Sequence, residues 1–319
     1  MRDDAALFSD SFDGYLAKIQ MRALRTVLVE GRFDKNLVTR LVRHLGIALG
    51  KDVVVDTVEM IREVNGITSN REKVEAVHRA VNKPERFAAF VDREFRKFST
   101  SSGVFHDDLA KHYVAADSCF WTRGHSTENY FLSLEYLLRF LEFWVPELDT
   151  KSDLETLSRH IDEFVTAAIC LSFVLFSQNL LSKASGILRA SHWQKVDGQY
   201  KLDVAEVCKV LLQRGAAATV CDTIPTKFDN CAEVLRRENL SDDRKWCAHG
   251  HLGWNAVWTG LSQFLREKGI AEKTVSEVET GQQVAKYACV AELWISRFEE
   301  RPDDSPLALL DWLRLKVAA

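Results

Sequence analysis

Residues 25–50 have the sequence RTVLVEGRFDKNLVTRLVRHLGIALG, and this stretch decides the fold class. Its first part, 25–30, is a short run rich in β-branched residues, which is typical of a buried strand. The run ends at Glu30, and over 33–50 apolar residues recur at helical spacing, with Gly50 as the predicted stop. The apolar stripe consists of Leu37, Val38, Leu41, Val42, Leu45 and Leu49. A strand that leads directly into an amphipathic helix predicts an α/β fold.

The alternation of strand and helix continues along the chain. A helix over 14–24 precedes the first strand, and a second strand follows over 52–58. A helix over 69–82 then begins at a serine or asparagine cap, and a third strand covers 86–92. The order β-α-β-α-β favours parallel pairing with right-handed crossovers. We therefore expect a parallel sheet flanked by helices.

Beyond the third strand the pattern becomes mainly helical. The segment 95–117 has no clear period and is interpreted as a loop or an edge excursion. A fourth strand is predicted over 118–122 and a helix over 128–144, whereas 191–201 predicts a loop or a small hairpin. The remaining helix-period segments are 153–184, 202–214, 227–238, 251–267, 281–299 and 305–316.

This succession predicts two domains. An α/β domain is expected over 1–145, and a mainly α-helical C-terminal domain over 146–319. The helical domain is a candidate for partner binding or for a homodimer contact, and the sequence does not distinguish the two.

The composition indicates a soluble cytoplasmic protein. The N-terminal segment is acidic and lacks the apolar run of a signal peptide, and the most apolar stretch, 164–176, is shorter than a membrane-spanning helix. Seven cysteines occur without a CxxC pair, which is typical of reduced thiols rather than a disulfide framework. We expect no membrane contact.

Acidic residues stand where several of the predicted strands end. Glu30 closes the first strand, Asp92 and Glu94 follow the third, and Glu128 enters the helix after the fourth. Chemistry in a parallel sheet gathers at the carboxyl ends of its strands, and residues two apart in an extended segment point the same way. Clustered carboxylates need a cation, and oxygen ligands suit Mg²⁺ or Mn²⁺. Taken singly, each acid has a simpler interpretation as a solvated loop residue or an acid favoured in a first helical turn.

Three stretches together resemble a known family. VLVEGRFDKN (27–36), FVDREF (90–95) and GHSTENYF (124–131) resemble the Toprim fold of OLD-type nucleases. They resemble more closely the AriB-like Toprim effector subunit of the PARIS anti-phage defence system. That family has a glutamate after the first strand in an EGxxD setting, a DxD-type pair after the third, and an H-S-x-E-N element. GHLGW (250–254) is similar to a glycine-histidine element near the end of such proteins.

The resemblance implies a magnesium- or manganese-dependent endonuclease and assigns its residues. Glu30, Asp92, Glu94 and Glu128 match positions that imply metal ligands and catalytic residues, and His125 is a further catalytic candidate with an alternative role in orienting its loop. Glu94 departs from the family, in which the second acid of the pair is an aspartate, so its carboxylate reaches one methylene further.

The resemblance also implies a toxin effector of antiviral defence. The implied substrate is tRNA, with DNA left open, and the implied partner is an ABC-type ATPase that restrains the nuclease. The chain has no GxxxxGK[ST] phosphate-binding loop, so an ATPase would be a separate chain. A non-catalytic Toprim-fold subunit that regulates an ATPase complex is the alternative. A Toprim strand-joining or priming enzyme is disfavoured because no separate nucleophilic tyrosine domain is identified.

Polar residues beside the same motifs are candidate nucleic-acid contacts. Asp34 matches the second acid of EGxxD and is equally suited to cap the helix that follows. The basic candidates are Arg32, Lys35, Arg93, Arg96, Lys97 and Arg123. Such residues would track a phosphate backbone, although a solvated charged face explains them equally well. The net charge of −4 gives the whole chain no basic surplus.

One further group has ligand chemistry. Cys247, His249 and His251 lie within five positions, and such residues bind zinc. No fourth ligand occurs at the usual spacing, so a polar start to the helix over 251–267 is the favoured interpretation.

Overall fold

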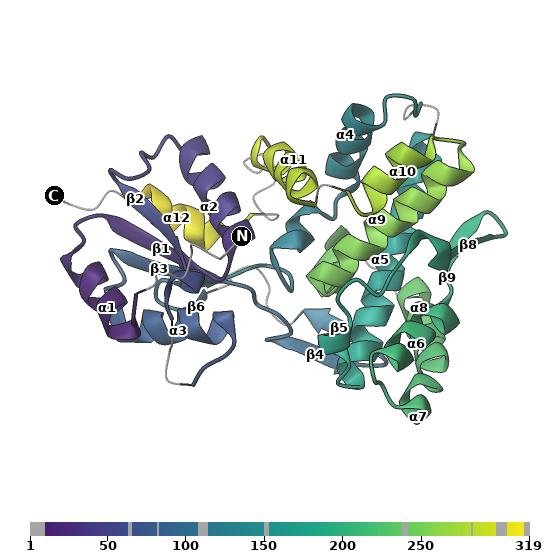
Figure 1. Cartoon of the computed structure of the whole chain (residues 1–319), viewed down its shortest axis with the longest axis horizontal. Helices are drawn as coiled ribbons and strands as arrows, with labels where there is room; N and C mark the ends of the chain where they lie inside the picture. Colours follow the sequence, from purple (N-terminus) through teal and green to yellow (C-terminus); the bar gives the residue numbers. More distant parts are fainter. Residues whose placement is uncertain are drawn as a thin grey trace. The chain divides into compact units, whose positions relative to one another are not determined.

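The computed structural model describes residues 10–62, 66–81, 83–107, 114–149, 153–237, 242–281, 283–297 and 305–315. The chain forms two compact units, each assembled from separate stretches (Figure 1). Unit 1 comprises Met1–Arg93, Lys111–Arg123 and Ile295–Ala319, and unit 2 comprises Glu94–Ala110 and Gly124–Trp294. The expected domain boundary at 145 therefore lies inside unit 2.

A five-stranded sheet forms the centre of unit 1. Its strands are β1 (Arg25–Val29), β2 (Val53–Thr57), β3 (Phe87–Val91), β6 (Val114–Ala116) and β7 (Cys119–Trp121). Their order is β2-β1-β3-β7-β6. The pairs β1–β2, β1–β3 and β3–β7 are parallel, and only β6 runs antiparallel to its neighbour β7. The predicted parallel sheet with flanking helices is confirmed, and a fifth strand extends it.

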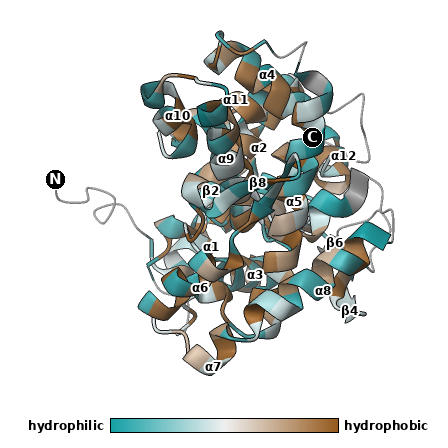
Figure 2. Cartoon of the chain, turned by 90° about the vertical axis from the view of Figure 1, so that its right-hand side faces the viewer, coloured by the Kyte–Doolittle hydropathy of each residue, from teal (hydrophilic) through white to brown (hydrophobic). Residues whose placement is uncertain are grey.

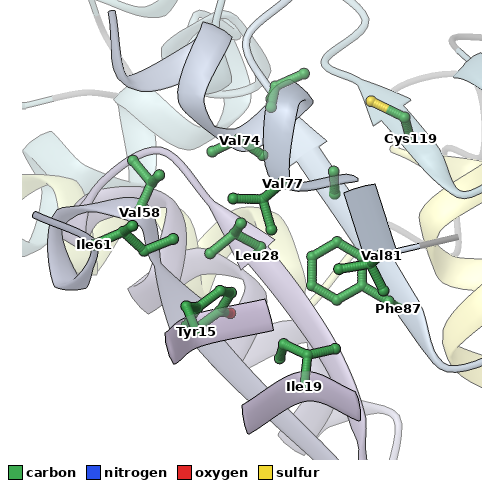
Figure 3. Packing of buried hydrophobic residues seen from close by; sticks show 12 residues of the cluster. Tyr15, Ile19, Leu28, Val58, Ile61, Val74, Val77, Val81, Phe87 and Cys119 are labelled. Carbon is green, nitrogen blue, oxygen red and sulfur yellow. The ribbon is translucent and has the colours of Figure 1, made fainter. Parts of the chain in front are cut away.

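Helices cover both faces of this sheet. They are α1 (Phe12–Met21), α2 (Arg32–His44), α3 (Asn70–Val81) and α12 (Leu307–Arg314), with a 3-10 turn η2 (Val58–Met60) after β2. Figure 1 shows α2 and α12 on one side of the sheet and α1 and α3 on the other. Figure 3 shows the core on the α1–α3 side, where Tyr15 and Ile19 pack towards Leu28, Val77 and Phe87. Alternation along β1 sends every second residue to each face, so both faces need a helical layer.

Helix α2 is shorter than the apolar stripe predicts. It ends at His44, and Gly46 then adopts a φ of +71°, in the left-handed region that glycine tolerates best. The apolar spacing continues past this turn, so periodicity alone placed the stop at Gly50. Helix α3 begins as predicted, with the Glu72 amide donating to the Ser69 hydroxyl.

The last described helix belongs to unit 1 and not to the helical domain expected over 146–319. Arg25 at the start of β1 donates to the carbonyl oxygens of Trp312, Leu313 and Leu315 at 2.7–2.9 Å. Its guanidinium carbon lies 5.2 Å from the centre of the Trp312 ring, whose Nε1 donates to the Pro84 carbonyl. A lone arginine thus satisfies the carbonyls at the end of α12 that have no partner within the helix.

Unit 2 is mainly helical and includes two hairpins. Its elements are β4 (Phe98–Ser101), β5 (Val104–Asp107), η3 (Thr127–Phe131), α4 (Leu134–Trp144), α5 (Leu154–Ser177), η4 (Leu181–Lys183), η5 (Ala190–His192), β8 (Trp193–Val196), β9 (Gln199–Leu202), α6 (Val204–Gln213), α7 (Ala218–Cys221), α8 (Ile224–Arg237), η6 (Asp242–Cys247), α9 (Gly250–Glu267), α10 (Glu272–Glu279) and α11 (Gln283–Ile295). Helices such as α4 and α8 carry apolar and polar faces (Figure 2). The short helices α7 and α10 were not predicted.

The predictions for the two segments that form hairpins have different outcomes. The segment 95–117 is predicted as a loop or an edge excursion. The loop alternative is wrong at 98–107, where β4 and β5 pair antiparallel, and β6 at 114–116 forms an edge of the sheet in unit 1. Residues 108–113 lie outside the described part. The hairpin alternative for 191–201 is confirmed by the pairing of β8 with β9. Its turn residues Asp197 and Gly198 both have positive φ, as a two-residue hairpin turn requires.

Helix α5 is the core of unit 2. It has 24 residues and ends at Ser177, so the helix predicted over 153–184 is confirmed except at its C-terminal end. Length and composition alone would allow it to cross a membrane, but 67% of its most apolar window is buried within the protein, as in the core helix of a soluble protein. At Gly260 of α9 an added Cβ would lie 2.4 Å from the Phe164 ring, so this glycine allows the two helices to pack closely.

The Arg25 contact predicts a large effect on the stability of unit 1. Replacing Arg25 by methionine keeps an apolar stem but leaves buried carbonyls without a donor. We expect the free energy of unfolding of the full chain to fall by about 3 kcal/mol in chemical denaturation. Arg32→Met, at a position whose side chain is 77% exposed, serves as the control and should change it little. Equal losses in both variants would contradict this role of Arg25.

Candidate functional site

The first candidate site lies at the carboxyl edge of the sheet in unit 1. Val29 pairs with Phe90 in the parallel register, so the residues that follow β1 and β3 leave the sheet side by side. The Asp92 amide donates to Glu30 Oε1 at 2.8 Å. The structure therefore brings Glu30 and Asp92 together, as the sequence predicts. Their role as metal ligands stays a prediction.

The Glu30 carboxyl lies in an acidic environment. Burial raises its pKa most, the charges of Asp34 and Glu75 raise it further, and the Asp92 amide and Arg71 act in the opposite direction. The net result is a pKa of about 7. Crowded carboxyls of this kind gain stability when a cation replaces the proton.

The donor set at this edge suits a hard divalent ion. Glu30 and Asp92 offer carboxylate oxygens, and Mg²⁺ commonly binds through one or two carboxylates while keeping several waters. The described residues contain no group of three or more His, Cys, Asp or Glu side chains placed to hold a metal ion. The four-carboxylate set predicted from the sequence therefore stays a prediction.

Asp34 acts as a helix cap. Its Oδ2 accepts the Gly31 amide at 3.2 Å, which satisfies an amide at the start of α2. The capping interpretation of the EGxxD aspartate is thus confirmed. Because its charge also raises the Glu30 pKa, Asp34 links the start of α2 to the acidic edge.

The geometry expected for Glu94 is wrong. The prediction treated residues 92–94 as extended, with two carboxylates on one side. Strand β3 ends at Val91, and Glu94 has a φ of +52°, in the left-handed region. Its side chain is exposed and its amide donates to the His125 carbonyl at 2.7 Å, within unit 2. The turn removes the two-residue alternation on which the prediction relied.

The second candidate site lies in unit 2 and centres on Glu128. Ser126 Oγ donates to Glu128 Oε2, and His251 Nδ1 lies 3.0 Å from Oε1. Burial raises the Glu128 pKa, but the hydrogen bond and charge of His251 and the Ser126 hydroxyl outweigh it and lower the pKa to about 2. Both carboxylate oxygens thus have partners in the same unit. A metal-ligand role for Glu128 stays a prediction.

Close packing at two glycines and the hydrogen bonds of one asparagine stabilise this cluster. An added Cβ at Gly250 would lie 1.7 Å from Ser126 Oγ, and one at Gly124 would lie 2.6 Å from Asn129 Cβ. Asn129 Oδ1 accepts the Ser126 amide, and Nδ2 donates to the carbonyls of Lys245 and Ala248. The GHSTEN and GHLGW elements, more than a hundred residues apart, therefore form one structure.

Histidines and aromatic rings pack beside this cluster. The ring centroids of His125 and His249 are 4.2 Å apart, and Phe95 contacts both rings. Burial, followed by the charge of His251, lowers the pKa of His249 to about 4, which keeps this imidazole neutral. His125 is buried, an arrangement that suits its alternative role in orienting the loop.

The basic candidates have unequal exposure. Arg93 is fully buried and donates to the Arg123 carbonyl, so its predicted place in an exposed basic rim is wrong. Arg32 is exposed and pairs with Glu59 at 3.6 Å. Of the other predicted nucleic-acid contacts, Lys97 is exposed and Lys35, Arg96 and Arg123 are half-buried. The planar guanidinium of Arg93 thus donates to a backbone carbonyl and does not face solvent.

The cysteine and histidines at 247–251 do not converge on one point. Cys247 contacts the Phe105 carbonyl, whereas His251 contacts Glu128. This arrangement agrees with the favoured interpretation as a polar helix start. The Glu128–His251 pair, and the effects of Arg71 and Glu75 on the Glu30 pKa, were not predicted from the sequence. The only sequence signal for the pair is the repeated Gly-His dipeptide at Gly124 and Gly250.

Comparison with known protein families and with curated proteins finds no match to this chain. The likeness to Toprim nucleases therefore rests on the quoted motifs.

The raised pKa of Glu30 predicts a pH-dependent stability effect. Because the folded-state pKa of about 7 exceeds the unfolded value of 4.5, the free energy of unfolding declines as pH rises from 4.5 to 7. Glu30→Gln removes this decline, so the variant should gain about 2 kcal/mol relative to wild type between pH 5 and pH 8. Asp311→Asn, an exposed carboxyl, is the control. A variant-to-wild-type difference independent of pH would refute the assignment.

The close packing at Gly250 predicts that a side chain at this position destabilises unit 2. Gly250→Ala places a methyl group in the Ser126–Glu128 contact and should lower the free energy of unfolding by about 2 kcal/mol or more. Gly31→Ala is the matched control, because its Cβ would meet only atoms 3.9 Å away at a φ of −149°. Calorimetry of both variants measures the change in stability. A Gly250→Ala protein as stable as wild type would argue against close packing between Gly250 and Ser126.

Proposed function

We propose that the chain is a magnesium-dependent nuclease of the Toprim type, with its metal site at the carboxyl edge of unit 1. The observation that carries the proposal is the pairing of Glu30 with Asp92 at the ends of adjacent parallel strands. The raised pKa of Glu30 supports it, because a cation would stabilise a carboxylate that is buried and lies near other acids.

Glu30 and Asp92 would hold the ion in this proposal. When bound, the ion supplies charge for the phosphodiester oxygens and lowers the pKa of a water. The Asp92 amide fixes the orientation of the Glu30 carboxylate, and Asp34 secures the start of α2 directly after it. Exposed Arg32 and half-buried Lys35, in the first turn of α2, would contact substrate phosphates in this proposal.

The biological setting rests on the resemblance to the PARIS effector subunit. On this basis tRNA is the first substrate to test, and an ABC-type ATPase is the expected partner. The expected context is antiviral defence in the cytoplasm. A homodimer is part of the same expectation. The core helix α5, buried within unit 2, is compatible with a protein that works without a membrane.

A second candidate is a non-catalytic subunit that keeps the fold and regulates an ATPase partner. The observation that favours it is the left-handed turn at Glu94, which removes the second acid of the DxD-type pair from an extended strand. A site with two carboxylates instead of three would bind metal more weakly. The two candidates differ in whether any divalent ion supports cleavage.

The test is incubation of the purified chain with total tRNA and with plasmid DNA, with and without Mg²⁺ or Mn²⁺. We expect cleavage that requires the metal, and Glu30→Ala and Asp92→Ala should each lower its rate by about 100-fold or more. Asp311→Asn, on the exposed side of α12, should cleave like wild type.

Two results would count against the nuclease. Metal-dependent cleavage that persists in both acid variants would place the site elsewhere. Absence of cleavage with every metal and substrate, together with retained binding to an ATPase, would favour the regulatory subunit.

A further inference from the structure

Helix α2 carries an aromatic side chain at the sheet edge where Glu30 lies. Phe33 follows Glu30 by three positions and is 43% exposed. Among the residues of unit 1 that the structure describes, no other phenylalanine, tyrosine or tryptophan is exposed. The metal site proposed above does not use this ring.

The periodicity of α2 explains why the ring lies at this edge. Residues four apart lie on the same face of a helix, so Phe33 shares a face with Leu37 and Leu41, which are both fully buried. Side chains in a helix also tilt towards its N-terminus, which for α2 is the end next to Glu30. The apolar face of α2 therefore continues one turn beyond its fully buried part and ends in a partly exposed ring.

A cationic side chain lies next to this ring. Arg32 is 77% exposed, and it pairs with Glu59 at 3.6 Å, a surface ion pair of the weak kind that a phosphate can replace. Glu59 itself lies at the start of α2, because a Cβ added at Gly31 would be 3.9 Å from its Oε1. The guanidinium and the ring thus occupy the same turn, directly after Glu30.

A ring beside a cationic side chain matches the two parts of a nucleotide. The phosphate contacts the cation, and the flat face of the base stacks on the ring, whichever of the four bases it is. Bases in a duplex stack on their neighbours and are not available to a side chain, whereas unpaired bases are. An exposed phenyl ring at the acidic edge therefore favours an unpaired nucleotide over a base pair.

We propose that Phe33 is a specificity-determining residue that stacks on an unpaired base, next to the phosphate held at the acidic edge. The inference rests on the proposed nuclease function and deepens it, because it names the feature by which the site selects its substrate. Arg32 contacts the adjoining phosphate. Selection depends on the exposed face of a base and not on its identity, so loops of RNA and of DNA both satisfy it.

The test measures binding of the full chain to fluorescent probes by anisotropy. The probes are an RNA hairpin with an unpaired loop, its DNA counterpart, and a blunt duplex of the RNA stem. Ca²⁺ is present as a hard cation for the acidic edge. We expect wild type to bind both hairpins about 10-fold more tightly than the duplex.

Variants at Phe33 separate stacking from a structural role. Phe33→Leu keeps an apolar side chain on the buried face of α2 but removes the aromatic face, so it should weaken hairpin binding by about 10-fold and leave duplex binding unchanged. Phe33→Tyr should bind like wild type. Phe143→Leu, at a 76% exposed position in unit 2, is the matched control. A purely structural effect would weaken hairpin and duplex binding alike.

A second measurement uses the wild-type chain, in case Phe33→Leu fails to fold. Hairpins with 5-bromouracil in the loop are irradiated in the complex, and the cross-linked peptide is identified by mass spectrometry. We expect the cross-link at Phe33, because the halogenated base reacts with the ring on which it stacks.

The outcomes separate this inference from the nuclease function. Equal affinity of wild type for hairpin and duplex, unchanged hairpin binding in Phe33→Leu, or cross-links only at other residues would each overturn the stacking role, even if metal-dependent cleavage occurs. Stacking at Phe33 without cleavage in any metal would instead support the nucleotide contact and count against the nuclease.

Discussion

The hydrogen bond from the Asp92 amide to Glu30 is the contact on which the interpretation of unit 1 depends. It exists because β1 and β3 are parallel neighbours in a register that pairs Val29 with Phe90. The carboxyl is thereby fixed at the sheet edge and shielded from water. Burial first, and the neighbouring acids after it, raise its pKa to about 7, so protein folding holds this group close to its protonation midpoint at neutral pH. A cation is the natural replacement for that proton.

The sheet of unit 1 could be predicted from sequence because local pattern decides it. The buried runs at β1 and β2 are rich in β-branched residues, that at β3 is apolar, and the helices between them carry clear apolar stripes. Glu30 and Asp92 follow from topology, since parallel strands end at one edge. Glu94 could not be predicted, because its left-handed conformation depends on a tertiary contact with the His125 carbonyl.

The cluster around Glu128 shows a different limit. Its acid was recognised, but its partner His251 is 123 positions further along the chain and was interpreted as a possible zinc ligand or a helix start. Only packing shows why Gly250 precedes it, since any side chain there would meet Ser126. Arg93 is a similar case. It is buried and donates to the Arg123 carbonyl, and no pattern in the neighbouring sequence predicts this contact.

The contact between Arg25 and the Trp312 carbonyl joins residues 287 positions apart. Between them the chain passes through all of unit 2, which comprises Glu94–Ala110 and Gly124–Trp294. During synthesis the ribosome therefore releases every residue of unit 2 before α12 appears. Unit 2 can fold while β1 still lacks α12, and the Arg25 contact that closes this side of unit 1 forms only afterwards. A newly made chain thus completes the helical cover of its first strand after unit 2 has been synthesised.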